Sequence, residues 1–179
     1  GGGIFLPVKF SNAKPVFRRV EIISNEAIHG GGIYVGGKPT GLLKMYNSKV
    51  TNNIATGFGG GFYIIRSTNK IELYDILITQ NSAVTKGGGI YVYDAKPRIE
   101  RSLFEGNASK NGGAIYVDRP NAELNLINGV LYNNTATERG SAIFSYYQST
   151  VNIYHTTISN NTAGLDATIR PDYGSKIYF

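Results

Sequence analysis

Four charged residues form the grouping in this sequence that could most readily catalyse a reaction or bind a cation. Asp94 and Asp118 lie just past the ends of equivalent segments in consecutive repeats, as do Arg66 and Arg119. Two carboxylates on adjacent strands could act as an acid and a base, or could hold a cation. Alternating carboxylates and guanidinium groups more often form solvated salt bridges, each worth ~0–1 kcal/mol. We therefore predict a salt-bridge cluster here, and we assign no catalytic residue and no metal site.

A regular series of aromatic residues is the second candidate site. If the aromatic residues point outward from parallel strands about 4.8 Å apart, they form a flat strip roughly 24 Å long. Such a strip could bind sugar rings or an aromatic partner. Alternatively, it could only stabilise the sheet, by ~0.2–1 kcal/mol per neighbouring pair. The candidate ligand-binding strip consists of Phe5, Tyr34, Tyr63, Tyr91, Tyr116 and Phe144. A shorter outward series contains Tyr46, Tyr74 and Tyr154, interrupted by Glu100 and Ile127.

Asparagines recur at a fixed place in each repeat. An amide has no ionisable group, so this column supplies neither an acid nor a base. Stacked Asn side chains can instead hydrogen-bond to one another and to the backbone at a corner. We predict a structural Asn column of Asn25, Asn53, Asn81, Asn107, Asn134 and Asn161. The glycosylation sequons that begin at Asn107, Asn133 and Asn160 are expected by chance in such Asn-rich corners, and His29 and His155 lie in different columns.

These residues keep their spacing because the chain consists of internal repeats. A glycine-rich phrase followed by alternating apolar residues occurs at 1–6, 30–35, 59–64, 87–92, 112–117 and, more weakly, 140–145. A second pattern has the same repeat spacing. An apolar residue lies three positions before each Asn of the column, and a small residue lies two positions after it. Each unit is about 25 to 29 residues long, as in stacked solenoid repeats.

Within each unit the apolar residues alternate with a period of two, for example at 43–46, 71–74 and 151–154. This alternation indicates strands, and no segment has the apolar spacing of a helix. Successive copies running in one direction predict an all-β fold, a single-stranded right-handed parallel β-helix of about six turns. Residues 1–179 should form one solenoid domain, which we expect to be excised from a longer β-helix because the sequence starts and stops inside a repeat. The predicted lumenal column contains Ile33, Phe62, Ile90, Ile115 and Ile143.

Two tetrapeptides in one unit carry a resemblance to a known family. FEGN at 104–107 and GGAI at 112–115 resemble the FxxN and GGAI signature of the polymorphic outer-membrane protein repeats. Those repeats form the pectin-lyase-like β-helix of autotransporter passenger domains. The resemblance covers nearly the whole chain, with Ile, Val or Leu in place of Phe and Gly in place of Ala elsewhere, although the chain lacks the cysteines of many members. It implies an exported, adhesin-like scaffold outside the cell or at its surface, and it brings no catalytic residues.

Composition excludes several other classes. The 179 residues are 41% hydrophobic and 17% charged, the balance of a single folded domain. The absence of cysteine excludes disulfides, thiolate catalysis and Cys-bound zinc, and no apolar run is long enough for a membrane-spanning helix. Nucleic-acid binding would need a continuous basic stripe. Lys44, Glu72 and Arg98 instead alternate in sign, so no nucleic-acid partner is expected despite the net charge of +6.

From these features we expect a structural or adhesive β-helix scaffold that presents columns of side chains to a polysaccharide or a cell-surface partner. End-to-end self-association of such rods is a further expectation. A carbohydrate-binding module that uses the aromatic strip is one alternative, and a polysaccharide lyase or hydrolase on the same fold is another. No cofactor is expected in any of these cases.

Overall fold

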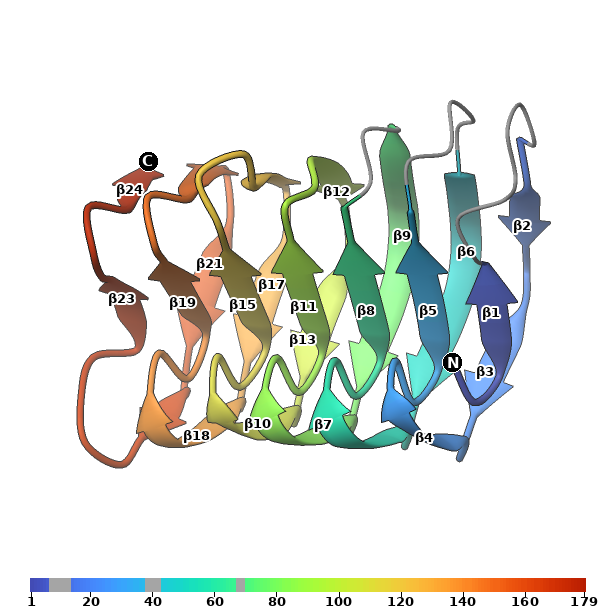
Figure 1. Cartoon of the computed structure of the whole chain (residues 1–179), viewed down its shortest axis with the longest axis horizontal. Coiled ribbons are helices and arrows are strands. Elements are labelled where there is room, and N and C mark those ends of the chain that lie inside the picture. The colour runs from blue at the N-terminus through green and yellow to red at the C-terminus, as the bar shows by residue number, and fades with distance from the viewer. Residues whose placement is uncertain (7–13, 38–42, 67–69) are drawn as a thin grey trace.

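The computed structural model describes residues 1–6, 14–37, 43–66 and 70–179, which form a rod of coiled strands (Figure 1). Neighbouring turns stack along the long axis, so the first strand lies near one end of the rod and the C-terminus lies at the other. The described residues contain no helix. The predictions of an all-β chain and a parallel solenoid are therefore confirmed.

Sheets A and C each take one strand from a turn. Sheet A has seven parallel strands and sheet C has six, which gives about six complete turns. Sheet A contains β1 (Ile4–Leu6), β5 (Ile33–Gly36), β8 (Phe62–Ile65), β11 (Ile90–Tyr93), β15 (Ile115–Asp118), β19 (Ile143–Tyr146) and β23 (Ile169–Pro171). Sheet C contains β4 (Glu26–His29), β7 (Ile54–Phe58), β10 (Ser82–Lys86), β14 (Ala108–Asn111), β18 (Thr135–Arg139) and β22 (Thr162–Ala163).

Sheet B is bent into two halves. The strands β6 (Leu43–Thr51) and β9 (Ile71–Thr79) run through both halves, and each has a residue with positive φ in its middle, Asn47 at 47° and Asp75 at 58°. The first half also contains β2 (Val16–Arg18), β12 (Pro97–Glu100), β16 (Glu123–Ile127), β20 (Thr150–Tyr154) and β24 (Lys176–Tyr178). The second half also contains β3 (Glu21–Ile23), β13 (Leu103–Glu105), β17 (Val130–Tyr132) and β21 (Thr157–Ser159).

The predicted lumenal column is confirmed by the strand register of sheet A. Ile33, Phe62, Ile90, Ile115 and Ile143 are aligned on successive strands, and each is at most 1% exposed. Aliphatic side chains from sheet B join them in one continuous core along the axis. Because side chains alternate across a strand, the residues between these positions must leave sheet A on its outer side.

The glycines at the corner between sheets C and A explain the glycine-rich phrase. Gly59 has φ of +66°, which disfavours any residue with a Cβ atom. At the next position, a Cβ on Gly60 would lie 2.4 Å from the carbonyl oxygens of both Gly88 and Ser82 on the adjacent turn. The phrase is thus required by backbone conformation and close stacking of turns, as predicted, and in the part of the chain that the structure describes no helix follows it to present a phosphate-binding site.

Candidate functional site

The outer side of sheet A brings the predicted aromatic residues into one column. Strand register aligns them on six successive turns. Neighbouring ring centroids are 5.0 to 5.4 Å apart along the whole series. We call this set the aromatic column; its members are Phe5, Tyr34, Tyr63, Tyr91, Tyr116 and Phe144.

Most of the aromatic column is buried, which corrects the expectation of a solvent-exposed strip. Tyr63, Tyr91 and Tyr116 are 7%, 3% and 2% exposed, and Phe144 is 3% exposed. Phe5, at 57%, is the member that presents a large surface to solvent. The column therefore forms a second apolar cluster outside the lumen, separate from the main core.

Side chains from both flanks of sheet A cause this burial. Phe58 lies at the end of β7, on the sheet C side, and packs against the cluster together with Ile65, Tyr93 and Tyr146 from the ends of the sheet A strands. The Lys86 ammonium, at the end of β10, lies 4.7 Å from the centroid of the Tyr116 ring. These flanking columns come from positions that the alternation within one strand does not reveal.

His29 covers the column near its first turns. Its imidazole stacks on the Phe58 ring at 4.9 Å and on the Tyr63 ring at 5.1 Å. The Phe58 backbone N–H donates a hydrogen bond to His29 Nδ1 at 3.3 Å, which requires that this nitrogen is unprotonated. Burial, and then the positive charge of the N-terminus, lower the pKa of His29.

Asp118 is the acidic residue that contacts the aromatic column. It ends β15 and is 4% exposed. The Tyr91 hydroxyl donates a hydrogen bond to Asp118 Oδ2 at 2.9 Å, and Lys86 Nζ lies 3.5 Å from the same oxygen. Burial, followed by the nearby Asp118 charge, raises the pKa of Tyr91 above its ordinary value, and burial raises the pKa of Tyr63 to about 12.

The structure does not bring the two predicted carboxylates together. Tyr93 is in register with Asp118, so Asp94 falls beside Arg119 at the next corner, and only its backbone N–H contacts Asp118, donating to the carbonyl oxygen at 3.1 Å. Arg119 Nε lies 4.0 Å from Asp118 Oδ1, at the limit of an ion pair. Within the described residues, Asp94 and Arg66 form no ion pair. The predicted group is thus only partly a salt-bridge cluster, and its guanidinium groups contact aromatic rings.

A different aromatic surface is exposed at the corner beyond sheet A. The Arg119 guanidinium lies 5.1 Å from the Tyr93 ring centroid and 5.3 Å from that of Tyr147. Tyr146 contacts Tyr173 at 4.9 Å and Tyr147 at 6.4 Å. Tyr147 and Tyr173 are 42% and 63% exposed. We call this set the tyrosine–arginine surface: Tyr93, Arg119, Tyr146, Tyr147 and Tyr173.

Sequence reasoning missed the tyrosine–arginine surface because it followed only the middle position of each sheet A strand. Tyr93 and Tyr146 occupy the last position of their strands, in one column with Asp118. Extending the alternation by two residues would have identified that column. Tyr147 and Tyr173 lie at corners with φ of 53° and 49°, where the sequence shows no alternation.

Hydrogen bonds link the six asparagines of the predicted column from turn to turn. In each of the first five, from Asn25 to Asn134, Nδ2 donates to the Oδ1 of the Asn one turn further along, at 2.9 to 3.0 Å, and the backbone N–H of the same residue donates to that oxygen at 2.8 to 3.0 Å. The four central residues are fully buried, while Asn25 and Asn161 are partly exposed. Asn107 is therefore inaccessible to glycosylation, whereas Asn133 and Asn160 are exposed.

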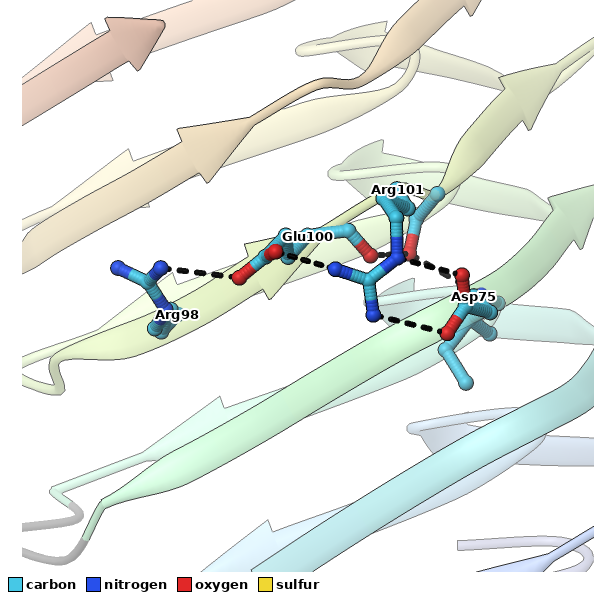
Figure 2. A network of polar contacts seen from close by, with 6 residues as sticks. Asp75, Arg98, Glu100 and Arg101 are labelled. Atoms are coloured by element: carbon cyan, nitrogen blue, oxygen red, sulfur yellow. Dashed lines mark hydrogen bonds and ion pairs between the residues drawn. The ribbon is translucent and has the colours of Figure 1, made fainter.

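Sheet B carries charges and a shorter aromatic stack on its outer side. The Tyr46 and Tyr74 rings stack at 5.2 Å, and the Arg18 guanidinium lies 4.3 Å from the Tyr46 centroid. Figure 2 shows the neighbouring ion pairs, in which Arg101 binds Asp75 through two nitrogens at 2.8 and 3.1 Å. Glu100 accepts from Arg98 at 2.9 Å and also from Arg101. This network occupies exposed positions and ties neighbouring turns together.

Among the residues that the structure describes, no group of three or more His, Asp or Glu side chains could hold a metal ion. No helix in them could cross a membrane. His155 is exposed at the bend of sheet B, far along the chain from His29 and in a different column.

Comparison with known proteins agrees with the geometry. A family model described as "Right handed beta helix region" matches residues 8–175, which is nearly the whole chain. No curated protein and no solved structure matches the sequence. The match confirms the predicted handedness and does not test the more specific resemblance to autotransporter repeats. By its strand order, its lumenal column and this match, the chain belongs to the right-handed β-helix family.

Proposed function

We propose that this β-helix is an exported or surface-displayed scaffold that adheres to polysaccharide through the tyrosine–arginine surface. The observation that carries the proposal is the exposure of Tyr147 and Tyr173 beside the Arg119 guanidinium. The location outside the cell is supported by the resemblance of 104–107 and 112–115 to autotransporter repeats. The β-helix itself supplies a rigid base on which these side chains are held.

The chemistry of this surface suits sugar rings. Tyrosine combines an apolar face with a polar hydroxyl and loses little conformational entropy when it binds a ligand, because it has two side-chain torsions. The Tyr146 ring, which meets Tyr173 edge to face at 64°, limits the movement of the exposed ring. Arg119 adds hydrogen-bond donors between two aromatic rings. The aromatic column itself offers little contact area, because its central rings are covered.

The contacts of Asp118 favour a protein that binds glycans without cleaving them. Its carboxylate already accepts from Tyr91 in the buried cluster and lies near Lys86, whose side chain is partly exposed. We therefore expect no lyase or hydrolase turnover of pectate, alginate or similar glycans. Turnover that is abolished by Asp118→Ala would overturn this part of the proposal.

Affinity electrophoresis in gels that contain soluble polysaccharides, together with pulldown on insoluble ones, tests the binding. The test variant combines Tyr147→Ala and Tyr173→Ala. The matched control is Tyr154→Ala, because Tyr154 is 45% exposed but lies on sheet B. We expect the double variant to lose retardation while the control and the melting temperature stay unchanged. Equal binding by all three proteins, or no retardation of the parent by any glycan, would contradict the proposal.

A further inference from the structure

Eight of the 13 tyrosines belong to one connected set of rings. Four lie on consecutive turns in the aromatic column, with centroid separations of 5.2, 5.4 and 5.4 Å. The set continues from Tyr116 to Tyr146 at 6.4 Å and from Tyr146 to Tyr173 at 4.9 Å. Tyr93 and Tyr147 branch from it at 6.3 and 6.4 Å. We call the main path the tyrosine relay: Tyr34, Tyr63, Tyr91, Tyr116, Tyr146 and Tyr173.

The composition makes tyrosines the principal targets for one-electron oxidation. The chain has no cysteine and no tryptophan, and its single methionine, Met45, is 1% exposed inside the lumen. Electron transfer between aromatic rings becomes slower as their separation increases, so rings in near contact favour a series of short steps. The rings at the centre of the relay are buried under neighbouring side chains, whereas Tyr173 is 63% exposed.

Asp118 gives one buried ring a place to release its proton. A tyrosine that loses an electron becomes a strong acid and must also lose its phenolic proton to form a neutral radical. Asp118 Oδ2 already accepts the hydrogen bond of the Tyr91 hydroxyl at 2.9 Å, so the proton has only to move along that bond. Lys86 Nζ, 3.5 Å from the same oxygen, helps to hold the carboxylate in place.

We propose that the tyrosine relay carries one-electron oxidising equivalents along the rod to Tyr173, with Tyr91 and Asp118 as the proton-coupled site on the way. A one-electron oxidant of the radical or peroxidase class takes an electron from Tyr34, whose proton goes to water. In each later step one electron passes from the next phenol to the tyrosyl radical, the radical oxygen takes up a proton, and the next phenol releases one. At Tyr34, Tyr63, Tyr116, Tyr146 and Tyr173 these protons are exchanged with water, because the hydroxyl oxygens keep contact with solvent. At Tyr91 the proton moves to Asp118 when the radical forms and returns from Asp118 when the radical leaves.

At the exposed end the radical can react outside the molecule. Two neutral tyrosyl radicals on two chains can join through their ring carbons, and the hydrogen on each joined carbon then moves as a proton to the oxygen of its own ring, which restores both phenols and gives dityrosine. Because Tyr173 is the most exposed ring of the connected set, the product should form mainly at Tyr173, with a smaller share at the branch residue Tyr147, which is 42% exposed. An adhesive scaffold could thus be cross-linked under oxidising conditions, a role independent of glycan binding.

A tethered photo-oxidant tests the relay. A ruthenium polypyridyl maleimide is attached to the Phe5→Cys variant, whose thiol would be unique in the chain and lies next to Tyr34. With a cobalt(III) ammine as electron acceptor, a light flash oxidises the nearest ring, and peptide mass spectrometry measures oxidation and dityrosine at Tyr173. We expect Tyr173 products in the labelled parent and a several-fold loss in a Tyr63→Phe background, with oxidation at Tyr34 retained.

Matched variants separate the relay from other effects. Tyr63→Phe keeps the ring, so folding should be preserved, and Tyr116→Phe provides a second interruption that should act in the same way. Tyr74→Phe, in the sheet B stack, should leave the products at Tyr173 unchanged. Asp118→Asn should lower them because the proton acceptor is lost. Products at Tyr173 that persist in Tyr63→Phe and Tyr116→Phe would overturn the relay, and an unchanged yield in Asp118→Asn would overturn the role of Asp118.

Discussion

Tyrosines stack in nearly the same way on two faces of this rod, yet one stack is buried and the other is not. Tyr63 and Tyr91 on sheet A are 5.4 Å apart with an interplanar angle of 13°, and Tyr46 and Tyr74 on sheet B are 5.2 Å apart with an angle of 10°. Both pairs leave their sheet on the outer side. The sheet A pair is at most 7% exposed, whereas the sheet B pair is only half-buried.

The difference lies in the neighbouring columns. Sheet A tyrosines are flanked by large apolar side chains such as Phe58 and Ile65. These side chains pack over the rings because the burial of apolar surface lowers the free energy of the folded state. Sheet B tyrosines are flanked by Lys44, Glu72 and Arg101, whose charged ends remain hydrated while forming ion pairs. Strand alternation therefore decides which side of a sheet a ring occupies, and the flanking residues decide whether water reaches it.

The largest expected effect comes from truncating one ring on each face. Tyr91→Ala should lower the free energy of unfolding by about 3–5 kcal/mol, because it removes a fully packed aromatic ring. Tyr74→Ala should cost only about 0.2–1 kcal/mol, the contribution of a cross-strand pair. Urea unfolding followed by circular dichroism measures both. Similar losses for the two variants would mean that the two stacks are equivalent.

Removing one carboxylate from each face should have an intermediate effect. Asp118→Ala leaves the Tyr91 hydroxyl without its buried acceptor and should cost about 1–3 kcal/mol. Asp75→Ala removes an exposed pair with Arg101 and should cost about 0–1 kcal/mol. Repeating the urea titration in about 1 M salt sharpens the contrast, since screening reduces the exposed interaction more. If salt reduced both effects equally, Asp118 would not be acting from a buried position.

The smallest expected effect is a pH dependence caused by His29, which belongs to β4 of sheet C and stacks on the aromatic column of sheet A. The pKa of His29 is lowered in the folded state, so protonation favours the unfolded chain. The free energy of unfolding should be at its full value above the unfolded-state His pKa of about 6.5, and it should decrease as the pH drops below that value. Melting temperatures between neutral and acidic pH should show this loss, and His29→Phe should reduce it while keeping a stacked ring. His155→Phe is the control, and an equal change in that variant would contradict the assignment.

Much of the fold followed from the sequence because it depends on local spacing. Ile33 and Phe62 could be assigned to one lumenal column, and Asn53 and Asn81 to another, since a constant repeat length with period-two alternation determines both register and side. The burial of Tyr91 could not be predicted in this way. It depends on how side chains from separate strands lean across the sheet, which alternation along one strand does not reveal.

The tyrosine–arginine surface was not predictable from the repeat for a second reason. In the last turn of sheet A the position of the aromatic column is taken by Arg170, and Tyr173 lies in a turn that departs from the repeat pattern. At such corners the backbone has positive φ values and forms short loops, which determine where each side chain points. The column to which a corner residue belongs can therefore be assigned only from the backbone structure.

The Asn column has a mechanical consequence. Its side chains connect each turn to the next, and partners are 26 to 28 residues apart in the chain. The hydrogen bonds between turns run along the rod, so a pull on its two ends would load them in tension, one turn after another. Each turn that detached would release about 90 Å of extended chain. Such a rod would resist bending yet lengthen in repeated steps under load, dissipating the work of a pull while the turns further along stay folded.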